Sequence, residues 1–316
     1  MNATQKTLPH HKFRTDIEGL RALAVLAVVI NHVGIELLSG GFLGVDIFFV
    51  ISGFLITGNI CRDIEAGKFK MTSFIGRRIK RLFPALIVTI LATLCASYIW
   101  LSPGLALSTA KSALAGTVSL SNFWFLSEVG YFDTRAGQKP LLHTWSLGVE
   151  EQFYLVWPFL LMLAARIAGR RGYIIMIAGL GLLSLIAAQV WLKISPSSVF
   201  YLTQFRLFEF AIGGLVAILC PTGIKKNLAT VVWSLGIILV FGSLFLFDKT
   251  TPMPGVLSLI PCLGVALVII AGVESRFDKL LSNKVARLIG RLSYSVYLVH
   301  WPITVSYTHL TLPTKA

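Results

Sequence analysis

The chain has 316 residues, of which 55% are hydrophobic and only 13% are charged. A soluble domain carries roughly 25% charged residues, and the mean hydropathy here is +0.78. The composition therefore excludes an ordinary soluble protein and indicates one that crosses a membrane several times. A net charge of +14 would suggest nucleic acid in a soluble chain, but most basic residues stand in short segments beside apolar runs, where they orient a membrane protein. We expect the lipid bilayer as a partner and no nucleic acid.

A membrane-spanning helix needs about 20 mainly apolar residues. In chain order the sequence predicts nine of them, and a shorter tenth helix within 104–126, over the ranges 20–38, 42–60, 82–101, 145–165, 173–192, 202–219, 228–247, 256–273 and 289–307. The fold class is therefore all-α, a polytopic helical membrane protein with about nine or ten transmembrane helices. Lys and Arg are concentrated on the side of the N-terminus, and the positive-inside rule predicts that this side is cytosolic.

No internal repeat, linker or low-complexity tract divides the chain, so we expect a single transmembrane domain over 1–316. The last residues, VSYTHLTLPTKA, keep neither the apolar run nor an obvious stop. Two interpretations of 304–316 are open: a truncated span with a non-native tail, or an ordinary polar tail on the outer side. The four cysteines stand singly, without the spacing of a metal site, and we expect no bound metal.

Two ionisable residues frame the first predicted span, Arg21 and His32. They are eleven positions apart, close to three helical turns, so both side chains point to nearly the same face. An ionisable group in a bilayer is costly unless it faces a protein interior or a water-filled cavity. The spacing therefore indicates an inward-facing functional stripe, with a snorkelling Arg21 and a packing histidine as the plain alternatives.

The second span returns from the outer side and brings Asp46 near the level of His32. A carboxylate beside an imidazole fixes its tautomer and raises its basicity, as a general base for a hydroxyl requires; the plain alternative is an interfacial cap residue. The glycines of this segment predict a close approach of helices or of a ligand: Gly40, Gly41, Gly44 and Gly53.

A basic cluster, FIGRRIKRLFPAL, precedes the third span on the predicted cytosolic side. It is either a topology signal or a phosphate site, since Arg77 and Arg81 are four apart on a helix and a guanidinium fork suits phosphate oxygens. With Arg21 and Arg78 they form a cationic set on the inner side.

Further polar residues fall in the predicted outer half of the spans. His143 is seven positions before Glu150 and eight before Glu151, so the three share one helical face. Arg206 and Glu209 are spaced i, i+3, which also fits a structural ion pair. The last span adds His300 together with Tyr294 and Tyr297, which also fit an interfacial belt. The separation by depth suggests a phosphate-rich donor held from inside and an acceptor met from outside.

At these residues the sequence closely resembles the bacterial membrane acyltransferase-3 family, which includes O-acetylases of lipopolysaccharide O-antigen, peptidoglycan and other surface glycans. The resemblance runs from about residue 13 to 303 and rests on six stretches in the same order: Arg21 to His32, GGFLGVDIFFVISGFLI, RRIKRLFPAL, SNFWF, LLHTWSLGVEEQFYLVWP and LSYSVYLVHWP.

The resemblance implies an O-acyltransferase of the bacterial cytoplasmic (inner) membrane. Such an enzyme moves an acyl group, usually acetyl from cytosolic acetyl-CoA as co-substrate, to a hydroxyl of an envelope glycan or glycolipid. It implies His32 as the catalytic residue, Arg21 as its partner, and Arg77, Arg78 and Arg81 as CoA-binding residues. From the residues themselves we expect Asp46 to assist His32, and we expect the outer set to bind the acceptor: His143, Glu150, Glu151, Arg206 and Glu209. Some family members add an extracytoplasmic SGNH-type domain, for which this sequence has no counterpart.

A proton-coupled transporter or flippase of a glycan or lipid intermediate is the alternative, because intramembrane Asp, Glu, His and Arg also build proton relays. A transporter would predict inverted repeats, and the sequence shows no repeat. Thioester consumption that depends on His32 would distinguish the enzyme from the transporter.

Overall fold

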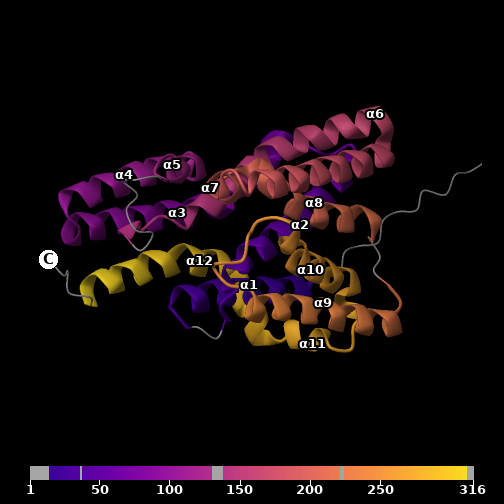
Figure 1. Ribbon diagram of the computed structural model, residues 1–316. Coiled ribbons are helices and arrows are strands. Elements are labelled where there is room, and N and C mark those ends of the chain that lie inside the picture. The colour runs from indigo at the N-terminus through magenta and orange to yellow at the C-terminus, as the bar shows by residue number, and fades with distance from the viewer. Residues whose placement is uncertain (1–13, 36–37, 130–137, 221–223, 312–316) are drawn as a thin grey trace, which may run out of the picture.

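The computed structural model describes residues 14–35, 38–129, 138–220 and 224–311, which form helices and connecting turns with no strand among them. The helices are α1 (Thr15–His32), α2 (Gly44–Glu65), α3 (Met71–Trp100), α4 (Pro103–Thr117), α5 (Ser121–Ser127), α6 (Thr144–Trp191), α7 (Pro196–Tyr201), α8 (Thr203–Leu219), α9 (Lys226–Leu246), α10 (Leu259–Ala271), α11 (Asp278–Leu281) and α12 (Lys284–Thr311). The long helices run side by side along a common direction (Figure 1). The all-α prediction is confirmed.

Each of the nine predicted spans falls on a helix. One helix ends earlier than predicted, and two of the spans form a single bent helix. The helix α1 ends at His32 rather than at residue 38, because the chain turns at Gly34, whose φ of 83° ends the helical path. The two predicted spans 145–165 and 173–192 both belong to α6, which bends at Ala168 and Gly169. The expected short helix within 104–126 is present as α4 and α5. Residues 312–316 of the tail lie outside the described ranges.

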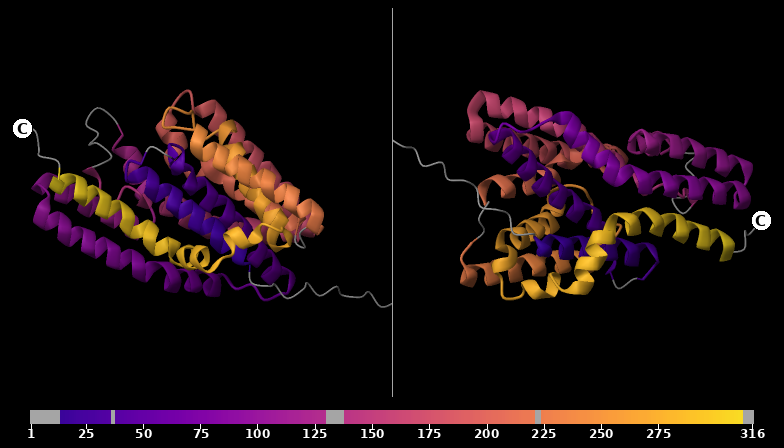
Figure 2. Two further views of the ribbon diagram at one scale, coloured as in Figure 1. Left: turned by 90° about the horizontal axis from the view of Figure 1, so that it is seen from below. Right: turned by 180° about the vertical axis from the view of Figure 1, so that it is seen from behind.

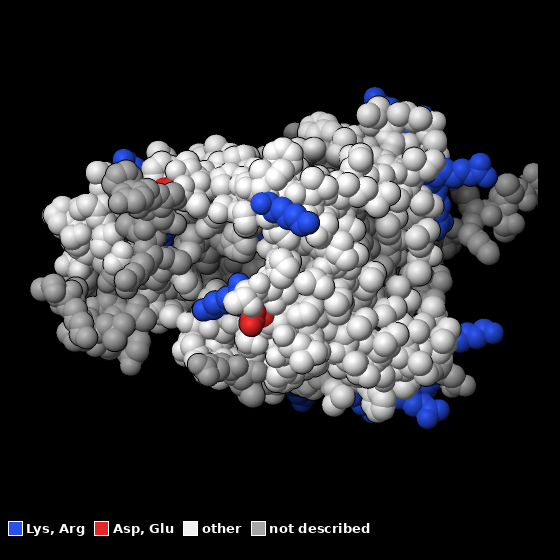
Figure 3. All heavy atoms as spheres, in the orientation of Figure 1, with Lys and Arg blue, Asp and Glu red and all other residues white. Residues whose placement is uncertain are grey.

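Within the described residues, four helical stretches are long and apolar enough to cross a membrane: Gly41–Glu65, Met71–Trp100, Thr144–Trp191 and Leu228–Leu246. The bend in α6 gives its 48 residues two arms, each with the length of a span. In Figure 3 Lys and Arg gather along the right-hand end, where α6 bends and α9 begins, and a smaller group of charged side chains lies near the middle of this face. The chain is an integral membrane protein.

The helix α2 lies at the centre of the bundle. Of its span window, 67% is buried inside the protein, against 17–33% for the other three stretches. One face of α2 packs with α1, α9 and α10 in a first core cluster, and the other packs with α6 and α8 in a second. The helix α12 runs along α1 and reaches α3 (Figure 2). Polar residues of α1, α2, α6 and α12 therefore meet inside the protein.

Two glycines bring α2 and α8 into backbone contact. A Cβ atom added at Gly53 would lie 2.0 Å from the carbonyl oxygen of Phe210, and one added at Gly213 would lie 1.9 Å from that of Val50. Since backbone cannot move aside as a side chain can, only glycine allows this spacing. The close approach predicted for Gly53 is a helix–helix contact of the kind that small residues permit in membranes.

We predict that Gly53→Ala destabilises the protein by about 1–3 kcal/mol, the usual cost of overpacking a core. Gly58→Ala is the matched control on the same helix, because its added Cβ would make an ordinary contact at 3.4 Å with Ala217. Thermal unfolding of both variants in detergent measures the difference. Equal melting temperatures would contradict the proposed backbone contact.

Candidate active site

A polar pocket opens between α1, α2, α3, α6 and α12. About 730 Å³ of empty space lies within it, a volume that includes space open to solvent at its mouth. Its lining combines apolar residues with three arginines, a glutamate and several hydroxyl groups: Arg21, Arg78, Arg81, Glu150, Ser52, Ser146, Ser293, Tyr154, Tyr294 and Tyr297. A mainly apolar wall with a few convergent polar groups is the usual form of a ligand site.

Glu150 lies in this pocket and accepts two hydrogen bonds. Ser52 donates from α2 and Tyr154 donates from the next turn of α6, both to the same carboxylate oxygen. The sequence grouped Glu150 with the outer residues, but the structure brings it to the same pocket as Arg21 and Arg81. The reason is the depth of α6, which begins at buried Thr144, so that two turns carry Glu150 well inside the protein.

The arginines of the inner side differ in their surroundings. Arg21 donates from Nε to Ser293 Oγ at 3.2 Å, which ties α1 to α12 beside the pocket. Arg78 lies over the Tyr154 ring, 5.1 Å from its centroid, and lines the pocket together with Arg81. Arg77 is 64% exposed and lies 3.9 Å from Asp63 on the surface. The pocket therefore presents three guanidinium groups, with Arg77 outside its lining.

Tyr297 connects this pocket with a cluster of histidines. Its hydroxyl is 2.6 Å from Ser146 Oγ and donates to the His143 carbonyl at 3.2 Å, and its ring lines the pocket. The same ring packs against two imidazoles, with centroid distances of 5.7 Å to His143 and 5.2 Å to His300. One aromatic side chain therefore touches both the arginine pocket and the histidines.

His32 and His300 form a direct pair between α1 and α12. His32 Nδ1 is 3.0 Å from His300 Nε2, and the rings are stacked. The Trp301 ring meets His32 edge-on at 4.6 Å, and its Nε1 donates to the Lys139 carbonyl at 2.9 Å. Arg21 and His32 thus both face α12, which agrees with the common helical face that their eleven-residue spacing predicted. His32 is half-buried, which leaves part of its ring accessible.

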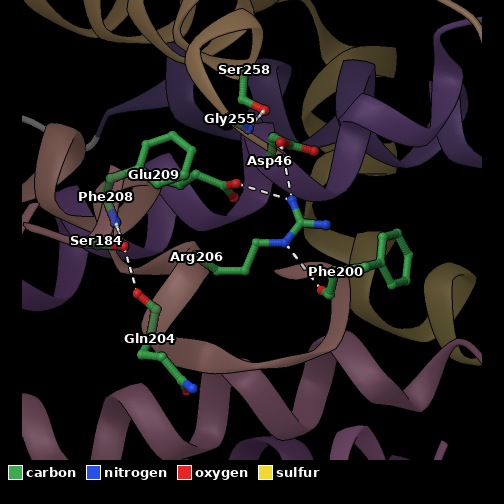
Figure 4. Close-up of polar contacts among 9 residues, drawn as sticks. All are labelled: Asp46, Ser184, Phe200, Gln204, Arg206, Phe208, Glu209, Gly255 and Ser258. Atoms are coloured by element: carbon green, nitrogen blue, oxygen red, sulfur yellow. Dashed lines mark hydrogen bonds and ion pairs between the residues drawn. The ribbon is translucent and has the colours of Figure 1, made fainter. Parts of the chain in front are cut away.

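Asp46 does not lie beside His32 as expected, and this pairing is corrected. Its carboxylate accepts from Arg206 Nη1 at 3.3 Å, and the same nitrogen donates to Glu209 at 3.0 Å (Figure 4). Arg206 also donates to the Phe200 carbonyl at 3.2 Å. All three ionisable groups are buried. Asp46 approaches Arg206 because a carboxylate in a span needs a cation or donors nearby, and α8 supplies them.

The triad of Asp46, Arg206 and Glu209 therefore joins α2 to α8, away from the lining of the arginine pocket. His143 lies in the histidine cluster, 5.7 Å from the centroid of His300. Glu151 is half-buried and follows Glu150 on α6. Among the described residues, no group of three or more His, Cys, Asp or Glu side chains has the arrangement of a metal site.

Several residues of the pocket were missed from the sequence. Tyr154 carried a usable signal, because it is four positions after Glu150 and hence on the same helical face. Ser52 and Ser293 carried none, since a single serine in an apolar span is common and only the neighbouring helix shows what it meets. His300 was noticed but could not be paired with His32 across 268 positions of sequence.

The fold and the site together define an integral membrane protein with an arginine-lined pocket next to a histidine pair. Residues 14–315 match the acyltransferase-3 family, described as an acyltransferase domain. The chain belongs to this family.

Three curated relatives illustrate the match. The chain is 36% identical over 312 residues to peptidoglycan O-acetyltransferase OatA of Listeria monocytogenes, covering 92% of this chain and 49% of that protein. It is 35% identical to O-acetyltransferase OatA of Staphylococcus aureus, covering 93% and 51%, and 35% identical to a putative O-acetyltransferase of Staphylococcus aureus strain COL, covering 98% and 54%. The chain thus spans about half the length of these relatives. No solved structure gives a significant match.

We predict that Arg206→Met destabilises the protein by about 3–5 kcal/mol, because it leaves Asp46 and Glu209 buried without their cation. Arg287→Met is the control: Glu18, the partner of Arg287, keeps a second ion pair with Arg291 at 2.9 Å. Partly exposed pairs of that kind contribute at most about 1 kcal/mol. Thermal unfolding in detergent compares the two variants. Equal stability would contradict a structural role and favour acceptor binding at Arg206.

Proposed function

We propose that this protein is an O-acetyltransferase of the bacterial cytoplasmic membrane, moving acetyl from cytosolic acetyl-CoA to a hydroxyl of an envelope glycan. The single observation that carries the proposal is the contact of Tyr297 with both sites: its ring lines the arginine pocket and packs against His300, the partner of His32. A donor site and a catalytic histidine would then lie on either side of one residue. Family membership supports the same reaction class.

The arginine pocket fits an acyl-CoA donor. The phosphates of CoA need cations with several donors, and guanidinium groups bind phosphate oxygens in a bidentate manner. Arg78 and Arg81 lie in the first half of α3, toward the predicted cytosolic side, and both line the pocket. Arg21 lies further along the pocket, with Ser293 as its partner. We assign phosphate binding to Arg78 and Arg81. Arg77, which is exposed, lies outside the pocket lining on the same helix.

The proposed reaction transfers acetyl directly. The acceptor oxygen forms a bond with the thioester carbonyl carbon as the His32 imidazole takes its proton. The C–S bond breaks, and the leaving CoA thiolate receives that proton from the His32 imidazolium. The products are an acetyl ester and free CoA. A histidine serving as general base in this way contributes about 10²- to 10⁴-fold to a rate. The Listeria relative is named for peptidoglycan, and we take peptidoglycan as the first acceptor to test.

We predict that His32→Ala abolishes acetyl transfer. The experiment uses inverted membrane vesicles prepared from cells that lack their own O-acetylases. Labelled acetyl-CoA is added on the side that was cytosolic, and the label on envelope glycan and the release of free CoA are measured. Unchanged melting temperature of the variant establishes that it is folded. Label that is retained equally with and without His32 would refute the histidine as base. Glycan transport without any CoA release would favour the transporter instead.

We predict that the double variant Arg78→Ala, Arg81→Ala raises the donor KM, since each lost charge-assisted hydrogen bond costs about 1.5–3 kcal/mol, or at least about tenfold in affinity. Arg77→Ala is the matched control, because it removes a neighbouring arginine of the same helix that is exposed and outside the pocket lining. Steady-state kinetics with varied acetyl-CoA compares the two. An equal rise in KM for both would show that surface charge alone attracts the donor.

A further inference from the structure

We propose that His300 is a positioning residue that fixes the tautomer of His32, holding the His32 proton on Nδ1 so that Nε2 carries the free lone pair. The inference rests on the proposed function for its catalytic meaning, although its structural content can be measured without any activity. It is carried by a chain of two short contacts that runs from a backbone carbonyl through one imidazole to the next: Tyr297 O, His300 and His32.

The first contact sets the proton on His300. Its Nδ1 lies 2.6 Å from the carbonyl oxygen of Tyr297. A carbonyl oxygen has no proton to give, so the hydrogen bond forms only when His300 Nδ1 carries the hydrogen. In a neutral imidazole one nitrogen is the donor and the other the acceptor. His300 Nε2 is therefore the acceptor.

The second contact determines which nitrogen of His32 carries the proton. His300 Nε2 lies 3.0 Å from His32 Nδ1, and because Nε2 has only a lone pair to offer, the hydrogen must come from His32. His32 is then protonated at Nδ1 and bare at Nε2. An isolated imidazole side chain favours the opposite form, with its proton on Nε2. The arrangement therefore imposes the less common tautomer on His32.

This pair of hydrogen bonds requires a neutral His300, and the surroundings of the His300 ring favour the neutral form. His300 is 7% exposed, and the ionisable groups packed against its ring are the imidazoles of His32 and His143 and the phenol of Tyr297. None of these supplies a negative charge to a buried imidazolium, and burying an uncompensated charge is costly. Lys249, which interacts electrostatically with His32, is also a cation and offers no negative charge.

Packing holds both rings in this relation. Tyr297 and His143 lie against the His300 ring, and Trp301 meets the His32 ring edge-on while its indole donates to a backbone carbonyl. Either ring would have to displace an aromatic neighbour in order to flip. The packing therefore fixes the direction of the lone pair on His32 Nε2, and the hydrogen bonds fix which nitrogen carries it.

This geometry also helps the proposed reaction. When His32 Nε2 takes the acceptor proton, the ring becomes an imidazolium, and its Nδ1–H bond to His300 becomes charge-assisted and stronger. The interaction is therefore stronger in the transition state than in the ground state, which is the condition for faster chemistry. A base oriented by a third group is the general form of such sites, and here the third group is a neutral imidazole instead of a carboxylate.

The first test is spectroscopic. Solid-state NMR of protein labelled with ¹³C,¹⁵N-histidine resolves tautomers among the six histidines, and the signals of His32 and His300 are assigned by their loss in His32→Gln and His300→Gln. We expect both residues to carry their proton on Nδ1 in the native protein, and His32 to shift toward the Nε2-protonated form in His300→Leu. A native His32 protonated on Nε2 overturns the proposal, whether or not the protein transfers acetyl.

The second test is kinetic and uses a pair of variants. His300→Leu removes the acceptor, whereas His300→Gln places an amide oxygen where it can accept from His32 Nδ1. We expect His300→Leu to lower kcat by about 100-fold, the scale of a misplaced catalytic group, with the donor KM within about twofold of native, and His300→Gln to recover at least tenfold of that loss. Equal loss in the two variants, or a change confined to KM, overturns the proposal.

The two tests separate failure of this inference from failure of the proposed function. If native protein transfers no acetyl but His32 shows the Nδ1 proton and loses it in His300→Leu, the tautomer relay stands and the proposed reaction fails. If native protein transfers acetyl and His32 is protonated on Nε2, the reaction stands and the relay fails. Melting temperatures of both His300 variants, compared with native protein, exclude unfolding as the cause of a lost signal.

Discussion

The bilayer imposes one requirement on which the arrangement of this protein depends: a polar group within a span must find its partner inside the protein. Glu150 finds Ser52 and Tyr154, Arg21 finds Ser293, and His32 finds His300. Each of these contacts joins two different helices or two turns of one helix. The polar groups therefore decide which helix faces meet, while the glycines of α2 and α8 decide how closely they approach.

The helix α1 links the two parts of the site because it presents a polar residue at each level to α12. Arg21 meets Ser293 and His32 meets His300, so the two helices run in the same direction and share one interface. Gly290 allows that interface to be tight, since a Cβ atom there would lie 1.8 Å from the Glu18 carbonyl oxygen. A shift of α12 along α1 would therefore alter the pocket and the histidine pair together.

The sequence predicted those features that depend on one helix alone. The common face of Arg21 and His32 follows from their spacing along a single segment. The ion pair of Arg206 with Glu209 and the helix packing at Gly53 were each one of two alternatives that spacing or residue size offered. Features that depend on a second helix were not predictable. Hydropathy does not say how deep α6 begins, so the sequence did not bring Glu150 together with Arg21 and Arg81 in one pocket. Nor does it say that α8 brings Arg206 to Asp46, which separated Asp46 from His32.

Tyr297 contacts both the arginine pocket and the histidine pair, and this position helps to explain how the proposed transfer would favour a sugar hydroxyl over water. A thioester beside an open aqueous path would lose acetyl to hydrolysis, and closed sites prevent such side reactions by excluding water. Here the Tyr297 hydroxyl is engaged by Ser146 and by the His143 carbonyl, while its ring covers His300. Tyr297 is also buried, at 6% exposure. In the proposed reaction the thioester would pass beside this hydrogen-bonded tyrosine to reach the acceptor hydroxyl at His32, and the packing of Tyr297 would exclude water from the space that it fills.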